Sequence, residues 1–171
     1  DAYAASPVCS PTRASLLTGK YPAHLGLTNW IGGHARGKLL GAPNGDHLPL
    51  EERCLAGALK EAGYATWHVG KWHLGGEAYY PEKHGFDINI GGCEQGHQPV
   101  CFASKSGDAW QFSRLGRGDF DRFAQPYTAE YVKKYGFPES LIGTPKHVSD
   151  ALGDAMEETI TKLHATGKPF Y

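Results

Sequence analysis

The sequence lacks several features that would assign it to a protein class at once. No run of apolar residues is long enough to span a bilayer, so we expect no membrane span. The formal net charge is only −1, and without a basic excess the sequence gives no reason to expect nucleic acid as a partner. Internal repeats, low-complexity tracts and the Cys-x-x-Cys spacing of structural zinc sites are also missing. What remains is a globular protein with enough residues for a sizeable core.

Cysteine is scarce, and its four copies do not define a disulfide framework. Apart from Cys9, which belongs to the motif below, only Cys54, Cys93 and Cys101 remain, an odd number. A bond between Cys93 and Cys101 stays open for an exported protein, but nothing in their spacing requires it. We therefore expect reduced, buried thiols.

One stretch near the start places a reactive side chain at the beginning of a helix. From Cys9 it reads Cys-Ser-Pro-Thr-Arg-Ala-Ser-Leu-Leu-Thr-Gly. Ser10 is a natural N-cap and Pro11 suits the first helical position, so we expect a helix over about 11–17. Cys9 then lies at the positive end of the helix dipole, and Arg13 adds a permanent cation one turn along. This arrangement indicates chemistry on an anion.

A second segment predicts an α/β unit. Apolar residues recur with helical spacing over 55–62, Gly63 ends that helix, and 64–69 carry the aromatic and β-branched residues of a strand. Lys71 and His73 follow directly. In an extended chain their side chains point the same way, at the carboxyl end of a strand, where α/β sheets bind ligands. Taken alone, the pair is better explained as a surface lysine beside a packed histidine.

Together the two stretches resemble the two signatures of the sulfatase family, in the alkaline-phosphatase-like superfamily. The first signature, Cys-x-Pro-x-Arg-x-x-x-x-Thr-Gly, begins at Cys9, and the second, Gly-Lys-Trp-His-Leu-Gly, covers 70–75. The resemblance implies an α/β fold of three layers, with a mixed, mostly parallel central sheet flanked by helices. It also implies hydrolysis of sulfate esters, whether of sulfated carbohydrates or of aryl sulfates.

The same resemblance implies a set of residue roles. Cys9 is oxidised by a formylglycine-generating enzyme to formylglycine, whose hydrated gem-diol attacks sulfur and binds one Ca²⁺. Arg13 and Lys71 offset negative charge, Lys71 and His97 bind the substrate, and His73 hydrogen-bonds the formylglycine. Among residues of this chain only Cys9 is implied as a metal ligand, because the acidic pairs of the family cannot be located here.

The limits of the chain lead to further expectations. It opens on Asp1 without an initiator methionine and closes on Pro-Phe-Tyr, which reads as a strand just beginning. We expect residues 1–171 to be a partial sulfatase catalytic domain, truncated at both ends and inactive by itself. A helix from Thr144 to about Leu163 should precede the last strand, and 102–146 should form an excursion that carries substrate specificity. The resemblance implies an exported protein, whether periplasmic, extracellular or lysosome-like.

Two alternatives remain open. A phosphonate or phosphate-ester hydrolase of the same superfamily can carry the same motif. A degenerate homologue could bind sulfated polymer without catalysis, although the intact Cys9, Arg13, Lys71 and His73 argue against it.

Overall fold

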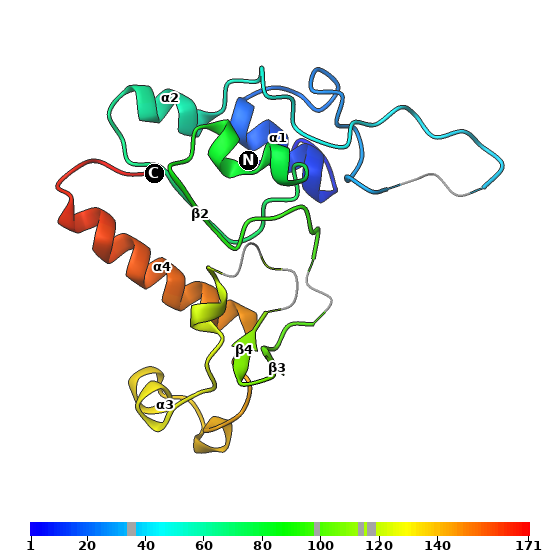
Figure 1. Ribbon diagram of the computed structural model, residues 1–171. Coiled ribbons are helices and arrows are strands. Elements are labelled where there is room, and N and C mark those ends of the chain that lie inside the picture. The colour runs from blue at the N-terminus through cyan, green and yellow to red at the C-terminus, as the bar shows by residue number, and fades with distance from the viewer. Residues whose placement is uncertain (34–36, 98–99, 113–114, 116–118) are drawn as a thin grey trace.

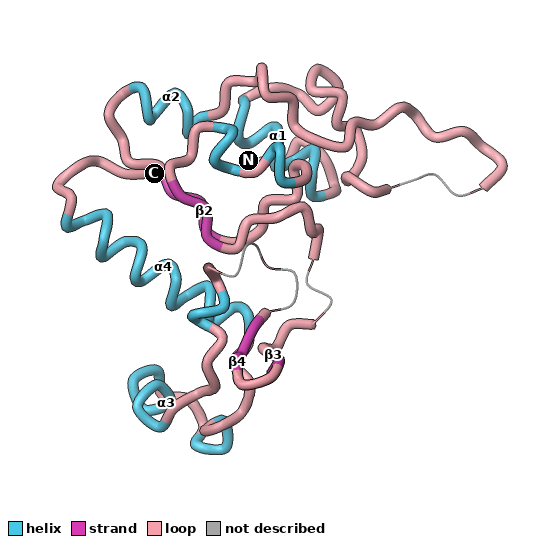
Figure 2. The backbone as a smooth tube through the Cα atoms, viewed as in Figure 1, coloured by secondary structure: helices cyan, strands magenta, loops and turns pink. Residues whose placement is uncertain are grey.

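The computed structural model describes residues 1–171 except 34–36, 98–99, 113–114 and 116–118. The fold is mixed α/β, with short strands and helices joined by long loops (Figure 1), and Figure 2 shows how much of the chain is loop. Single 3-10 turns also occur at Glu77–Tyr79, Pro81–His84, Asp121–Phe123 and Glu139–Leu141. In the described part, no helix combines the length and the apolar character needed to cross a bilayer. The helices and strands are α1 (Cys9–Thr18), α2 (Leu55–Glu61), β1 (Trp67–Val69), β2 (Ile88–Ile90), β3 (Ser104–Ser106), β4 (Ala109–Gln111), α3 (Ala129–Tyr135) and α4 (Val148–Ala165).

Helix α1 begins two residues earlier than the sequence predicts. Its N-cap is Val8, so Cys9 is the first helical residue and Ser10 lies inside the first turn. The expectation that Ser10 caps the helix is wrong, because its hydroxyl is hydrogen-bonded to other segments instead. The helix ends at Gly19, whose φ of 71° is the left-handed conformation typical of a C-terminal glycine.

The expected α/β unit is present. Cys54 is the N-cap of α2, and β1 pairs in parallel with β2, with His68 opposite Asn89. On the other edge of β1, Ala65 forms a parallel bridge with Phe170, so the last residues join the sheet as predicted. Beyond Val69 the chain leaves the sheet, because Gly70 and His73 both have positive φ. Side-chain alternation therefore does not govern Lys71 and His73.

The segment between β2 and α4 leaves the sheet as an excursion. It contains the antiparallel β3–β4 hairpin and α3, which lie away from α1 and α2 in Figure 1. Helix α4 begins at Val148 rather than near Thr144, because Thr144 closes the preceding turn through bonds to the Leu141 carbonyl. Its N-cap is His147, whose Nδ1 accepts from the Ser149 amide at 3.1 Å.

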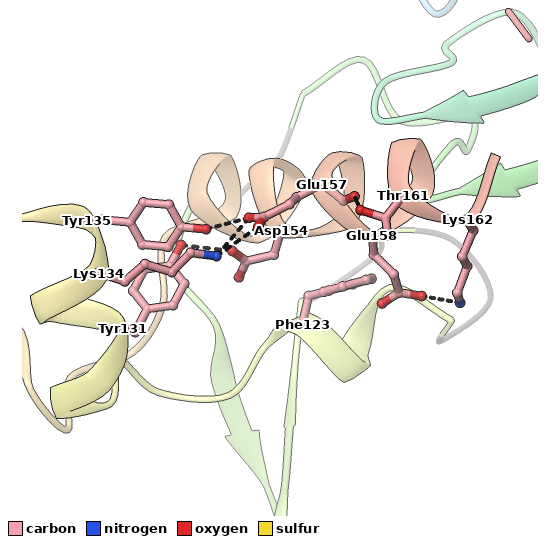
Figure 3. Close-up of a pocket in the computed structure, with 9 residues that line it drawn as sticks. All are labelled: Phe123, Tyr131, Lys134, Tyr135, Asp154, Glu157, Glu158, Thr161 and Lys162. Carbon is pink, nitrogen blue, oxygen red and sulfur yellow. Dashed lines mark hydrogen bonds and ion pairs between the residues drawn. The ribbon is translucent and has the colours of Figure 1, made fainter. Parts of the chain in front are cut away.

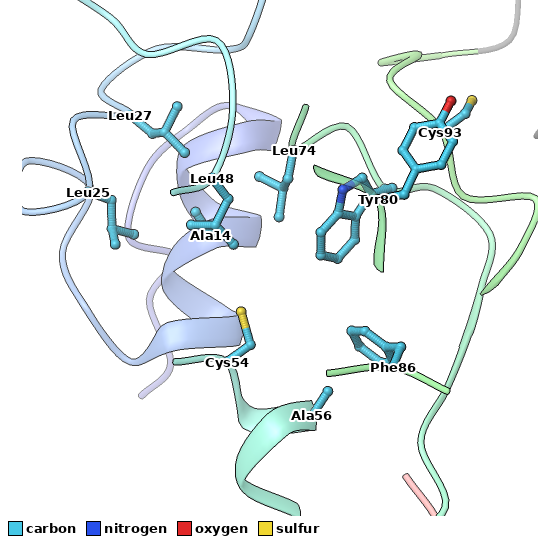
Figure 4. Packing of buried hydrophobic residues seen from close by; sticks show 11 residues of the cluster. Ala14, Leu25, Leu27, Leu48, Cys54, Ala56, Leu74, Tyr80, Phe86 and Cys93 are labelled. Carbon is cyan, nitrogen blue, oxygen red and sulfur yellow. The ribbon is translucent and has the colours of Figure 1, made fainter. Parts of the chain in front are cut away.

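Two apolar clusters hold these elements together. Figure 4 shows the first, in which Ala14 of α1 lies among loop residues such as Leu27, Leu48 and Leu74. Trp72 is completely buried in this cluster, so the signature segment 70–75 is part of the core. In the second cluster, apolar residues of α4 pack against β1 and the excursion. Cys54, Cys93 and Cys101 are free thiols, as expected, but Cys101 is exposed rather than buried.

Candidate active site

The two signature stretches meet at a contact between Cys9 and His73. Cys9 Sγ lies 3.2 Å from His73 Nδ1, although the two residues are 64 positions apart. Cys9 is the first residue of α1, so it lies at the helix end where the backbone N–H groups are free and favour an anion. The structure thus brings together the two residues that the sequence had placed in separate motifs.

His73 has a strained backbone that several bonds hold in place. Its φ is 55°, and it is the only non-glycine residue with positive φ among those described. Such a conformation costs about 1–3 kcal/mol and persists only where the surroundings enforce it. Here the His73 amide donates to the Cys93 carbonyl at 2.9 Å, and the His73 carbonyl accepts from Ser10 Oγ at 3.1 Å. Strain held in this way is a mark of a functional position.

The hydrogen bonds around His73 assign its tautomer. Nε2 lies 3.1 Å from the Ile31 carbonyl, which can only accept, so Nε2 carries a proton. The hydrogen of Ser10 Oγ goes to the His73 carbonyl, which leaves the Cys9 side chain as the donor to Nδ1. Burial lowers the pKa of His73, and the charge of Lys71 lowers it further. The imidazole is therefore a neutral base whose lone pair points at residue 9.

Arg13 holds the segment that carries Lys71 and His73. Its Nε donates to the Trp72 carbonyl at 2.7 Å, and Nη2 donates to the Lys71 carbonyl. Burial lowers the pKa of Arg13, and the proximity of Cys9 opposes that change. The guanidinium stays charged, because its intrinsic pKa is far above neutrality. Arg13 therefore fixes the turn between β1 and His73 and also adds positive charge close to Cys9.

Three cationic or protonatable side chains lie close enough to His73 to affect its pKa. Lys71, Arg13 and His97 all lower the pKa of His73 through their charges. His97 lines the pocket at Cys9, as expected for a substrate-binding residue. Lys71 is exposed and does not line that pocket, although its charge reaches His73. The catalytic and binding roles of these residues stay predictions, but their positive field converges where an anion would bind.

The pocket at Cys9 has a volume of about 450 Å³ and contains residues that the sequence did not point to. Trp30 and Ile31 come from the long loop after α1, and Glu94 and Gln95 come from the loop after β2. The only sequence signal for Trp30 was the length of its loop, since long loops in compact domains are often functional. The described part of the excursion 102–146 does not line this pocket.

The described residues do not form a calcium site by themselves. None of them belongs to a group of three or more His, Cys, Asp and Glu side chains that could hold a metal ion. Ca²⁺ takes six to eight oxygen ligands, and position 9 would supply only one of them after oxidation.

A slightly larger pocket, about 490 Å³, lies between α3 and α4, far from this chemistry (Figure 3). Its carboxylates are matched by neighbouring donors. Asp154 accepts from Tyr131 and Lys146, and Glu157 accepts from Lys134 and Tyr135. Because these charges neutralise one another, the pocket shows no polarised reactive group.

Comparisons with known proteins agree with this geometry. Arylsulfatase G of Rattus norvegicus is 33% identical over 181 residues, which is 99% of this chain and 32% of that protein. N-acetylgalactosamine-6-sulfatase of Sus scrofa is 48% identical over 86 residues, which is 50% of this chain and 16% of that protein. The crystal structure of Ps i-CgsB in complex with k-i-k-neocarrahexaose matches 99% of this chain and 34% of its own, with a TM-score of 0.58 and 24% identity, which shows the fold alone.

The chain thus spans about a third or less of the length of these relatives. The mixed α/β architecture described above is similar to the fold of that solved structure. A family model described as Sulfatase matches residues 1–171. This chain belongs to the sulfatase family.

Proposed function

We propose that the protein carrying this chain hydrolyses sulfate esters, with Cys9 oxidised to formylglycine as the reacting residue. The observation that carries the proposal is the 3.2 Å contact between Cys9 Sγ and the neutral His73 imidazole at the start of α1. The family membership supports it, since the sulfatase relatives align across both signatures. Sulfate groups on carbohydrates or aryl alcohols are the substrate class.

The residues present suit a formylglycine at position 9. One hydroxyl of a hydrated aldehyde there attacks sulfur and breaks the bond from sulfur to the alcohol oxygen, and the alcohol leaves with a proton from an acid outside this chain. The second hydroxyl then loses its proton, its oxygen re-forms the aldehyde C=O, and sulfate is expelled. In the structure the sulfur atom of Cys9 stands in for such an oxygen, because it already makes the hydrogen bond to His73 Nδ1. His73 accepts a proton from this position through Nδ1, while its Nε2–H continues to donate a hydrogen bond to the Ile31 carbonyl.

Charge on the transferring group is offset by the helix start and by nearby cations. Arg13 and Lys71 add positive charge, and Arg13 also fixes the main chain that carries Lys71. Donors arranged in advance around developing charge usually make the largest single contribution to such catalysis. His97 lies in the pocket as a further substrate ligand. From the sulfatase family we include Ca²⁺ in the proposal, with its other ligands outside this chain. For the same reason the proposal includes an exported compartment.

Two measurements test the proposal on the full-length protein, made in a host that oxidises a control sulfatase. Mass spectrometry of the tryptic peptide that contains Cys9 should show loss of sulfur and gain of a carbonyl. An assay with phenyl sulfate, phenyl phosphate and phenyl phosphonate should then show preferential release of sulfate. An unmodified thiol, or hydrolysis of the phosphorus esters alone, would contradict the proposal. Binding of sulfated polymer without turnover would support the non-enzymatic alternative instead.

A further inference from the structure

We propose that Trp30 determines which sulfate esters this site accepts, by packing its indole against the ring that carries the sulfate. The inference rests on the proposed function, because it takes Cys9 as the point of sulfate transfer. Trp30 lines the Cys9 pocket and is 45% exposed, so part of its indole surface is accessible to a ligand there. Aromatic rings in such pockets give a ligand a large contact area at little entropic cost.

A glycine turn supports the indole. The Gly33 amide donates to the Trp30 carbonyl at 2.9 Å, which closes a tight turn through Gly32. A Cβ placed on Gly33 would lie 2.7 Å from Trp30 Nε1, so the ring packs directly on that backbone. Only glycine leaves room for the ring in this position, and the turn therefore fixes where the indole lies.

The same turn is fixed to the catalytic residues. The carbonyl of Ile31, next to Trp30, accepts a hydrogen bond from His73 Nε2, and the Ile31 amide donates to Ser10 Oγ at 3.1 Å. Both main-chain groups of Ile31 are thus bonded to residues that adjoin Cys9 or contact it. The position of the Trp30 indole relative to the reacting residue is consequently set by hydrogen bonds rather than by a free loop.

The remaining side chains of the pocket indicate that the ring is a sugar rather than an aryl group. Glu94 accepts from Tyr80 Oη at 2.6 Å and from Gln95 Nε2 at 3.0 Å, so a carboxylate and an amide are held together in the pocket. These groups bind hydroxyls, whereas an aryl ring has no hydroxyl to offer them. A sugar ring has both an apolar C–H face for the indole and hydroxyls for Glu94 and Gln95.

The test compares Trp30→Ala and Trp30→Phe in the full-length protein with oxidised Cys9. The substrates are a set of galactose and glucose monosulfates and ethyl sulfate, which has no ring. In Trp30→Ala the ratio of kcat/KM for the best sugar sulfate to that for ethyl sulfate should fall roughly tenfold, through KM, because an aromatic packing surface is lost. Trp30→Phe should keep the ratio within about threefold, because a ring is retained. Tyr21→Ala is the matched control, since Tyr21 is 73% exposed and does not line the pocket.

The outcomes separate the inference from the proposed function. An unchanged ratio in Trp30→Ala, or an equal loss on both substrates, would overturn the role of Trp30 while leaving sulfate-ester hydrolysis intact. No turnover of any sulfate ester by the wild-type protein would refute both. Thermal melts of the variants confirm that the comparison concerns folded protein.

Gln95→Leu tests the choice of a sugar ring. It should lower kcat/KM for the sugar sulfate relative to phenyl sulfate by roughly fivefold, the value of one neutral hydrogen bond. An unchanged ratio between those two substrates would show that the pocket does not read sugar hydroxyls, and would overturn that part of the inference.

Discussion

The Cys9 pocket and the cleft between α3 and α4 are similar in volume, about 450 and 490 Å³, but their charged side chains are arranged in opposite ways. In the cleft, each carboxylate meets its own cation or hydroxyl, as Glu158 does with Arg122 and Lys162. At Cys9, the positive charges of Lys71 and Arg13 both lower the pKa of one neutral histidine, His73. Ion pairs within the cleft hold α3 and α4 together, whereas the positive charge around Cys9 can be neutralised by an anionic ligand.

The two regions also differ in how their side chains are held. Arg13 in the Cys9 region donates to main-chain carbonyls, so its hydrogen bonds are satisfied without a carboxylate that would cancel its charge. Lys134 in the cleft donates to both oxygens of Glu157. Pocket size therefore identifies neither site. The partners of the charged groups distinguish the two sites.

Removing one charge from each region should separate catalysis from structure. We expect Lys71→Ala in the full-length protein to lower turnover of a sulfate ester by roughly 10²–10³, the usual effect of losing one preorganised donor. The matched control is Lys134→Ala, which should leave the rate unchanged. Steady-state kinetics on both variants, with melts to check folding, decide the matter. Wild-type turnover in Lys71→Ala would mean that the lysine is only a surface residue.

Breaking the most buried ion pair of the α3–α4 region should affect stability alone. Lys146 Nζ lies 2.7 Å from Asp154, and the two side chains are only 9% and 18% exposed. We expect Lys146→Met to lower the free energy of unfolding by about 3–4 kcal/mol, because it leaves a carboxylate buried without its cation. Urea denaturation measures the loss, and kcat should stay at its wild-type value. If the double variant Lys146→Met/Asp154→Leu is no more stable than the single one, the uncompensated charge is not the cause.

The first apolar cluster, where buried His84 lies beside Trp72, and the α3–α4 cleft should respond to acid in different pH ranges. Burial lowers the pKa of His84 from 6.5 to about 4, so the unfolded chain takes up this proton first as the pH falls. Stability should therefore decrease from pH 6.5 down to 4, by about 3 kcal/mol for this residue, and then level off. In the cleft, the hydrogen bond from Lys134 lowers the pKa of Glu157 from 4.5, so its contribution is lost only below pH 4.5.

Urea midpoints measured at pH values from 7.5 to 3.5 check this prediction. His84→Gln removes the titrating group and should flatten the curve above pH 4.5. Glu157→Gln should remove a contribution that is constant above pH 4.5, so it should change the slope of the curve only below that pH. The same slope between pH 6.5 and 4.5 in His84→Gln and in the wild type would show that His84 is not responsible.

The smallest effect is expected at the exposed end of the cleft. Lys162 pairs with Glu158 one turn away on α4, where the two side chains are 57% and 35% exposed. Lys162→Ala should lower stability by only about 0.3–0.5 kcal/mol, and 0.5 M salt should reduce even that difference. A loss comparable to that of Lys146→Met would show that exposure does not govern the strength of these pairs.

The sequence alone predicted the family of the chain and much of its local structure. Spacing of apolar residues and glycines predicted α2, β1 and the end of α1, because these depend on backbone preferences over a few residues. The two signatures predicted the family, because a motif of fixed residue types can be recognised in the sequence without knowledge of the fold. The expectation of a sulfate-ester site at Cys9 follows from the same motif.

Only the tertiary structure decided how those residues meet. That Ser10 bonds the His73 carbonyl instead of capping its helix depends on a segment 63 positions away. That Trp30 lines the pocket depends on a turn whose carbonyl and amide are bonded to His73 and Ser10. Local preferences set which helix forms, but contacts between distant segments set which side chain lies against which. The physical reason is that such contacts carry no local pattern: their partners are chosen by packing of the whole chain.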